Sequence, residues 1–435
     1  MMRAWIFPLS AVAWLAPSAS AQSDPPPAFA FEGVTVVPMD SPRALPDQTV
    51  LISGDRIAWI GPRSRASLPP RTQRIAGQGR FLLPGLVDVH VHVTPEDFPL
   101  FLANGVTTVR EMNGSPDHLV WRDEVRRGVR VGPSLYVASP LLAGVRQQWR
   151  HTLVTSDTAA MRIVNELAAA GHDLIKVYDG LSPEVYRAIV AEAARVGLPV
   201  GGHIPEAVGL SWVLTHRQAE IEHVEQIARA VTSHDPDTAR IEPTAREIAG
   251  SGTWVVPTLA VIEGLTLTRT AAVQSRFAAP EMAFVDSATF GWWSTRRRPS
   301  PEPEPTPMAA RIAAFYRRLV GALARHGVRM AAGSDTPNPL MVPGFSLLEE
   351  IRALEGAGLS RFAALRAATR DAAELLGGLE EFGTVTVGKR ADLVLLDANP
   401  LDRLDRLQSP AGVMVRGRWL PRDTLRAMLQ GARRR

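Results

Sequence analysis

The chain has 435 residues, of which 46% are hydrophobic and 21% are charged. A chain of this length and composition can bury a large core in one large barrel or two ordinary domains, which excludes a disordered or fibrous protein. The formal net charge is +4 and cysteine is absent. Disulfide frameworks, thiolate catalysis and zinc fingers are therefore excluded, and any metal must be held by nitrogen and oxygen ligands.

The first residues have the layout of a secretory signal peptide. A basic residue, an apolar stretch and a run of small residues precede Gln22 in that order. We therefore expect cleavage after residues 1–21, an exported protein that is periplasmic or secreted, and a proline-rich linker over residues 22–30. No stable membrane anchor is expected, because the apolar stretch is shorter than the ~20 residues that span a bilayer.

The rest of the chain predicts an α/β protein with two parts. Short β-like runs with glycine and proline turns occupy residues 31–83 and 380–420, and we expect them to form one small β-sandwich domain. Residues 84–379 alternate apolar strands with amphipathic helices, which is typical of a (β/α)8 TIM-like barrel. The predicted strands are 86–93, 107–112, 134–140, 174–178, 200–204, 220–224, 254–259 and 329–334, and the clearest helices are 159–170, 183–196 and 309–326. An insertion after the seventh strand, 264–306, is expected to be either a lid or a surface loop.

Polar residues gather at the carboxyl ends of the predicted strands, where barrel enzymes place their chemistry. His90 and His92 end the first strand, and because side chains alternate along a strand, both imidazoles point to the same side and can reach one metal ion. Two unrelated buried histidines are the alternative. His203 and His223 lie at the tips of the fifth and sixth strands, as a second metal requires, and Asp335 follows the eighth strand as either a ligand or a helix cap.

Lys176 lies in the middle of the apolar fourth strand, where an unpaired ammonium is costly. The chain has only one other lysine, Lys389, and uses arginine for its remaining basic positions. An outward-pointing or ion-paired lysine is the alternative, but arginine would serve that purpose equally well. A neutral amine can instead add carbon dioxide and become a carbamate that bridges two cations.

The sequence resembles the amidohydrolase superfamily, in an exported metal-dependent branch related to prolidases and imidazolonepropionases. The resemblance runs from about residue 31 to 420. It is carried by LPGLVDVHVH at 83–92, the segments 105–110, 221–223 and 332–335, Lys176, His203, and GKRADLV at 388–394.

The resemblance implies a role for each candidate ligand. His90, His92 and Asp335 would hold a buried metal, His203 and His223 a more exposed one, and carboxylated Lys176 would bridge the two. Zinc is favoured by the ligand set, with manganese, cobalt or iron as alternatives. A hydroxide between the metals would cleave an amide-type C–N bond, and Asp335 would carry its proton to the leaving amine.

The substrate is a small molecule whose identity the sequence leaves open. Arg110, Arg150, His151 and Tyr178 are the candidate substrate contacts. A prolidase-like dipeptidase, an acyl-amino-acid hydrolase and an enzyme for lactams or lactones all remain alternatives. A mononuclear deaminase is disfavoured by Lys176, and a non-catalytic relative by the complete ligand set. No nucleic-acid partner is expected, since the basic residues are scattered, and a homo-oligomer is left open.

Overall fold

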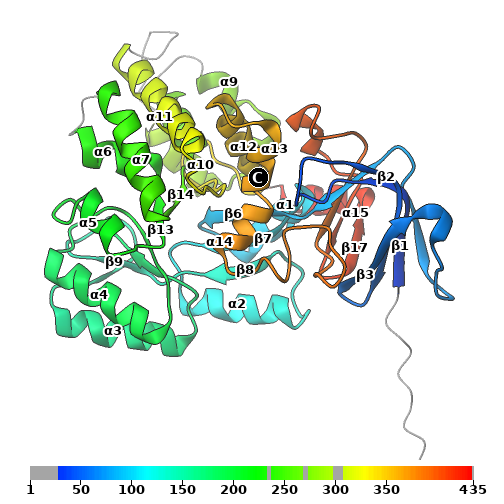
Figure 1. Cartoon of the computed structure of the whole chain (residues 1–435), viewed down its shortest axis with the longest axis horizontal. Coiled ribbons are helices and arrows are strands. Elements are labelled where there is room, and N and C mark those ends of the chain that lie inside the picture. The colour runs from blue at the N-terminus through cyan, green and yellow to red at the C-terminus, as the bar shows by residue number, and fades with distance from the viewer. Residues whose placement is uncertain (1–27, 233–236, 268–272, 297–306, 434–435) are drawn as a thin grey trace, which may run out of the picture.

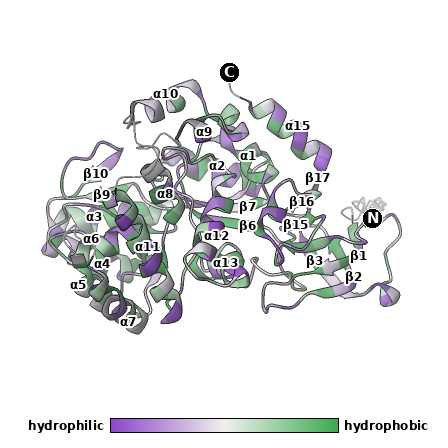
Figure 2. Ribbon diagram, turned by 90° about the horizontal axis from the view of Figure 1, so that it is seen from above, coloured by the Kyte–Doolittle hydropathy of each residue, from purple (hydrophilic) through white to green (hydrophobic). Residues whose placement is uncertain are grey.

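The computed structural model describes residues 28–232, 237–267, 273–296 and 307–433 (Figure 1). The predicted signal peptide and most of the predicted linker lie outside these residues. None of the helices in the described ranges combines the length and apolar character that crossing a bilayer requires. Figure 2 shows a small sheet region on one side of the molecule and a larger region of strands and helices on the other.

One mixed sheet unites segments from both ends of the chain. Its order is β17-β16-β15-β5-β1-β2-β3, with β4 beside β1. The joint lies where β15 pairs antiparallel with β5, with Val394 opposite Leu83. The strands are β1 (Ala28–Val36), β2 (Leu45–Ser53), β3 (Arg56–Pro62), β4 (Gln73–Ala76), β5 (Phe81–Pro84), β15 (Leu393–Leu396), β16 (Gly412–Val415) and β17 (Arg418–Pro421).

The apolar faces of this sheet share one core. Val34 and Ile57 from the first segment pack in the same cluster as Leu393 and Met414 from the last. The segments therefore fold together, while their division into the two layers of a sandwich stays a prediction. A helix that the sequence did not predict, α15 (Arg422–Ala432), follows the sheet and buries Leu425 in a cluster with residues of α1 (Phe98–Ala103).

The first seven predicted barrel strands all have counterparts, and the strand pairs among them are parallel. Together with β9 and β10, two short strands that the sequence did not predict, they form two sheets, β6-β7-β8 and β10-β9-β11-β12-β13-β14. The strands are β6 (Leu86–Val91), β7 (Val106–Glu111), β8 (Ser134–Val137), β9 (Leu141–Ala143), β10 (His151–Leu153), β11 (Ile175–Val177), β12 (Val200–Gly202), β13 (Glu220–Glu222) and β14 (Trp254–Val256).

The eighth predicted strand, 329–334, is an extended segment without a regular ladder. Single parallel bridges join Met330 to Val255 on β14 and Thr336 to Val91 on β6. A third bridge, between Ala138 and Leu174, joins the residue after β8 to the residue before β11 and so connects the two sheets. The fold is thus a mixed α/β structure in which parallel strands are linked edge to edge.

Helices alternate with these strands, as expected. The three clearest predicted helices correspond to α3, α4 and α11. Local sequence explains the ends of α4: the Ser182 hydroxyl accepts the Val185 N–H, Pro183 occupies the first turn, and Gly197 ends the helix at φ 77°. The helices are α2 (Pro116–Arg126), α3 (Asp157–Ala170), α4 (Pro183–Val196), α5 (Leu210–Thr215), α6 (Val224–Thr232), α7 (Ile241–Ser251), α8 (Leu259–Leu267), α11 (Pro307–Arg325), α12 (Ser346–Gly356), α13 (Arg361–Ala367) and α14 (Arg370–Leu375).

The described part of the 264–306 insertion contains two short helices, α9 (Val273–Phe277) and α10 (Ser287–Arg296). Residues 268–272 and 297–306, including the proline-rich run, lie outside the described residues. Trp293 on α10 is fully buried and donates its indole N–H to the Pro337 carbonyl at 3.0 Å. This helix therefore packs against the segment that follows Asp335.

Candidate metal centre

His90, His92 and Asp335 form a compact group of metal-ligating side chains. The two Nε2 atoms lie 3.4 and 3.3 Å from Asp335 Oδ1, and the candidate ligand atoms all fall within 4.8 Å of one another. Two ligand atoms that each lie ~2.1 Å from a tetrahedral ion are separated by ~3.4 Å. The spacing of this trio therefore fits a shared divalent cation.

The Nδ1 atoms of all four predicted histidine ligands face polar partners. A partner on Nδ1 fixes the ring orientation and the tautomer, and a proton on Nδ1 leaves Nε2 free as a metal ligand. The pairs are His90 with Glu222 at 2.6 Å, His92 with Glu111 at 3.3 Å, His203 with Asp179 at 2.8 Å and His223 with Thr258 Oγ1 at 2.8 Å.

His203 and His223 follow β12 and β13 and lie beside the trio. Their ring centroids are 5.2 Å apart, and His223 lies 4.7 Å from His90. His223 and Asp335 both adopt left-handed backbone conformations, at φ 64° and 51°. Such conformations are strained for residues other than glycine and cluster at functional sites.

Lys176 occupies the middle of β11, next to this cluster. Its side chain is buried, and Nζ has no hydrogen-bond partner among the described residues. Burial lowers the pKa of the amine, although Glu222 and Asp335 favour its charged form. An amine without a partner in this position is the polar atom that a bound group would satisfy.

The protonation states of His90 and Asp335 suit metal binding. Burial holds the pKa of His90 well below its usual value, so this ring is a neutral imidazole. Burial also disfavours the charge on Asp335, but His90, His92 and His223 outweigh it and hold the pKa of that carboxyl below its usual range. A neutral imidazole and an ionised carboxylate are the forms that ligate metals. Burial lowers the pKa of His92, but its hydrogen bonds to Asp335 and Glu111 outweigh burial and raise that pKa to about 9, so this ring must lose a proton when a metal binds.

The structure does not fit the predicted substrate contact at Arg110. This side chain is 3% exposed, and its guanidinium donates to the Val89 carbonyl, to Glu220 at 2.9 Å and to Glu222 at 2.9 Å. Because Glu222 also accepts from His90, Arg110 holds the carboxylate that orients a metal ligand. Arg110 precedes the end of β7 and its side chain is buried, so the structure does not bring it to an open position.

The other predicted substrate contacts lie closer to the surface. The Tyr178 ring is tilted against His203, with centroids 3.9 Å apart, so it borders the cluster. The Arg150 guanidinium donates to the carbonyl oxygens of Asn113 and Gly114. His151 donates its Nδ1–H to the Trp149 carbonyl at 2.8 Å. The structure thus brings Tyr178 to the cluster and engages the other two with nearby loop backbone.

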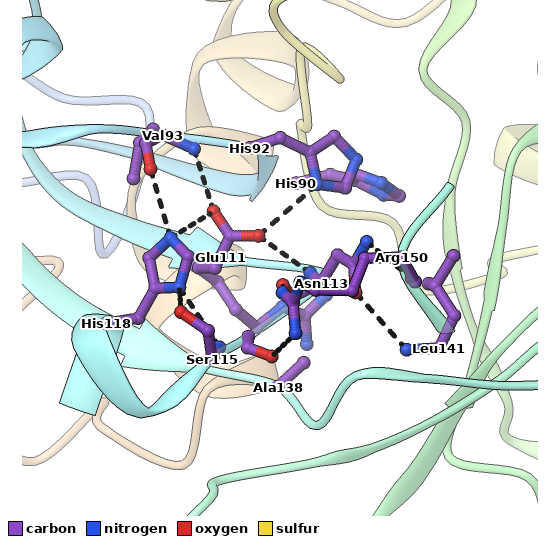
Figure 3. Close-up of polar contacts among 12 residues, drawn as sticks. His90, His92, Val93, Glu111, Asn113, Ser115, His118, Ala138, Leu141 and Arg150 are labelled. Atoms are coloured by element: carbon purple, nitrogen blue, oxygen red, sulfur yellow. Dashed lines mark hydrogen bonds and ion pairs between the residues drawn. The ribbon is translucent and has the colours of Figure 1, made fainter. Parts of the chain in front are cut away.

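Glu111 organises the loop behind His92 (Figure 3). One of its oxygens faces His92 Nδ1 and accepts the Asn113 N–H at 2.8 Å, while the other accepts the Val93 N–H at 2.8 Å and lies 3.5 Å from His118 Nε2. Sequence analysis missed Glu111, Asp179, Glu222 and Thr258. Their positions in the sequence were the available signal: Glu111 and Asp179 each directly follow a predicted site residue, and Glu222 directly precedes one.

Comparisons with known proteins agree with this geometry. The amidohydrolase family model matches residues 81–420. An imidazolonepropionase from Methylobacterium sp. (strain 4-46) is 26% identical over 382 residues, covering 81% of this chain and 88% of that protein. The solved structure of a bottromycin amidohydrolase is 27% identical, with a TM-score of 0.75, and the match covers 94% of this chain and 91% of that one.

A structure from Bifidobacterium longum, provisionally assigned as a prolidase, is 25% identical with a TM-score of 0.70 and covers 94% of this chain and 99% of that one. The family model alone spans most of the chain. Together with the trio of His90, His92 and Asp335, these matches show that the chain belongs to the amidohydrolase family and is a hydrolase acting on carbon–nitrogen bonds.

Proposed function

We propose that the protein hydrolyses an amide-type C–N bond at a binuclear metal centre in a closed (β/α)8 barrel. The observation that carries the proposal is Lys176: a buried amine without a hydrogen-bond partner among the described residues, on a strand beside four histidines and one aspartate. The three edge-to-edge bridges between the parallel strands support the closed barrel.

The donor set fits two divalent cations, most simply zinc. His90, His92 and Asp335 would hold one, His203 and His223 the other, and carboxylated Lys176 would join them. Bound cations would supply Lewis acidity and lower the pKa of water. The lowered pKa of the Lys176 amine favours its neutral form, which is the form that adds carbon dioxide.

The protein's own groups would then manage the proton. Asp335 Oδ1 faces the Nε2 atoms of His90 and His92, while Oδ2 lies 3.7 Å from His223 Nδ1. Asp335 would accept the proton that water loses as its oxygen bonds to the carbonyl carbon. The same carboxyl would return that proton to the nitrogen as the C–N bond breaks, so that a neutral amine leaves.

The substrate stays at the level of a class. A prolidase-like dipeptidase or an acyl-amino-acid hydrolase is the alternative within the same mechanism, and a lactam or other cyclic amide is equally consistent with the site. Tyr178 borders His203 and is the contact best placed to meet a substrate carbonyl. We also propose export, which N-terminal sequencing of the mature protein near Gln22 would test.

The experiment compares the two lysines of the chain. Lys176→Arg should remove most hydrolysis of a panel of dipeptides, N-acyl amino acids and lactams and lower the bound metal below two equivalents, because a guanidinium stays protonated and repels cations. Lys389→Arg is the matched control and should change neither quantity, since the Lys389 amine donates to the Leu379 carbonyl at a turn away from the cluster.

A second variant distinguishes loss of the proposed bridging carboxylate from a general disruption of the fold. Lys176→Ala leaves space that acetate or propionate can fill, so either acid should restore part of the activity to Lys176→Ala and none to Lys176→Arg. An active Lys176→Arg protein with its full metal content would overturn the proposal. A wild-type stoichiometry of one metal would favour the mononuclear deaminase alternative.

A further inference from the structure

A strongly basic cavity lies away from the candidate metal centre. It has a volume of about 210 Å³ and lies among the start of β8, the helix α2 and the closing segments of the small sheet. The metal ligands follow the carboxyl ends of the parallel strands, whereas Ser134 is the first residue of β8. The lining residues are Arg122, Val125, Arg126, Ser134, Leu135, Tyr136, Asp173, Arg390 and Arg416.

Cationic groups dominate this cavity. Four guanidinium groups and a single carboxylate, Asp173, line it. Arg122 binds that carboxylate at 3.1 Å, and Arg390 pairs with Asp392. Arg126 has only an exposed ion pair with Asp123, at 3.3 Å. The lining therefore holds more positive than negative charge, and most of its nearby carboxylates are already engaged.

Arg416 is the residue that points most directly to a ligand. Within the described part of the chain, its guanidinium forms no ion pair or side-chain hydrogen bond, and only its backbone N–H is engaged, by Asp392 at 2.7 Å. Arg416 and Gly417 form the two-residue turn between β16 and β17, at φ 48° and 75°. Such turns favour asparagine, aspartate or glycine at both positions, so arginine is strained there.

The hydroxyl group of Ser134 also lines the cavity. Ser134 is 9% exposed, and its hydroxyl makes no hydrogen bond to any described residue. A buried hydroxyl without a partner is unfavourable unless something else satisfies it. The cavity is lined by Arg416, which has no side-chain partner among the described residues, by three further arginines and by this hydroxyl. Each of these groups can donate a hydrogen bond to a bound acceptor.

We propose that this cavity binds a phosphate group, either as inorganic phosphate or as the phosphate of a small monoester. A phosphate presents several acceptor oxygens, and guanidinium groups bind such oxygens through pairs of N–H groups. Because Arg122 and Arg126 belong to α2 while Arg390 and Arg416 belong to the closing segments, the bound group joins the barrel to the small sheet.

The test uses the full chain with its metals, titrated with inorganic phosphate and with glycerol phosphate at constant ionic strength, with chloride as the matched salt. Both calorimetric binding and the thermal midpoint are measured. Wild type should bind phosphate and unfold at a higher temperature in its presence. Binding of inorganic phosphate but not of glycerol phosphate, or the reverse result, identifies which source of phosphate the cavity accepts.

Arg416→Asn makes the test specific to this cavity. Asparagine suits the turn, so the variant should be at least as stable as wild type without phosphate, yet bind phosphate roughly tenfold or more weakly because a charge-assisted hydrogen bond is lost. Arg418→Asn, on the exposed neighbouring strand position, is the control and should bind as wild type does.

The metal centre could also bind phosphate, and the comparison between variants removes that contribution because Arg416 does not touch the cluster. A wild type that shows no response beyond chloride would overturn the proposal. An equal phosphate response in wild type and Arg416→Asn would overturn it as well. So would a loss of stability in Arg416→Asn without phosphate, since that would mean that the arginine serves the fold itself.

Discussion

Replacing Glu222 by glutamine tests whether the network behind His90 controls metal binding. Glu222 accepts from Arg110 Nη2 at 2.9 Å and from His90 Nδ1 at 2.6 Å. A carboxylate accepts from both donors, whereas an amide has one accepting oxygen and one donating nitrogen. In Glu222→Gln, the amide nitrogen must therefore face either the arginine or the histidine.

Both arrangements carry a cost that can be estimated. If the amide nitrogen faces His90, the ring must accept at Nδ1 and carry its proton on Nε2, which then cannot ligate a metal. If it faces Arg110, a buried charge-assisted hydrogen bond worth about 1.5–3 kcal/mol is lost. Loss of a partner behind a metal-bound histidine lowers metal affinity by about 10–100-fold, which corresponds to about 1.4–2.8 kcal/mol.

The assay strips the protein of metal with a chelator and titrates zinc back while bound metal and hydrolysis are measured. Glu222→Gln should bind zinc more weakly by the factor given above and should also unfold at lower denaturant concentration. Glu166→Gln is the control for removing one carboxylate, since its ion pair with Arg162 at 2.7 Å is exposed and contributes little. Unchanged zinc affinity in a folded Glu222→Gln protein would refute the reasoning.

Two further predictions concern stability. Burial raises the pKa of Glu350 from 4.5 to about 8, so the folded protein holds this proton more tightly than the unfolded chain, and the free energy of unfolding should fall as pH rises through that window. Glu350→Gln should therefore match wild type near pH 5 and exceed it near pH 9 in denaturant titrations, by an amount on the order of a few kcal/mol; parallel curves would contradict this. A Cβ on Gly201 would lie 2.5 Å from Glu220 Cγ, so Gly201→Ala should disturb the pair with Arg110 and lower stability by about 1–3 kcal/mol. A Cβ added at Gly250 in α7 would meet no atom within 4 Å beyond the adjoining helix backbone, so Gly250→Ala should be neutral or stabilising, and equal effects of the two variants would rule out the steric argument.

Periodicity predicted the parallel strands because buried strands in such folds are short apolar runs between turn residues. The eighth segment is the exception. Its residues are apolar enough for a strand, but Met330 and Thr336 make only single bridges, and Asp335 turns into a left-handed conformation. Sequence also missed α15, because its alternation of charged and apolar residues follows directly on a β-strand and resembles a solvated tail.

The sequence could single out the group of His90, His92 and Asp335 because imidazole and carboxylate at strand ends are chemically distinctive. The groups that orient them could not be assigned in the same way. Glu111 and Asp179 are ordinary acidic residues by sequence, and only the fold places them against His92 and His203. Arg110 illustrates the limit: its position near a strand end suggested an open cation, whereas its three donated hydrogen bonds tie it to the interior.

The contrast between Arg110 and Lys176 joins composition to electrostatics. Both are buried basic side chains in one region of the strands, but Arg110 is held by two carboxylates while Lys176 Nζ has no hydrogen-bond partner among the described residues. Arg110 already pairs with both carboxylates, and although Glu222 and Asp335 favour the charged form of Lys176, burial outweighs them. Burial makes a charged ammonium unfavourable there, and it therefore lowers the pKa of Lys176. In a chain whose basic residues are arginines apart from Lys176 and Lys389, a lysine buried without a hydrogen-bond partner supports the proposal that Lys176 acts as a neutral amine.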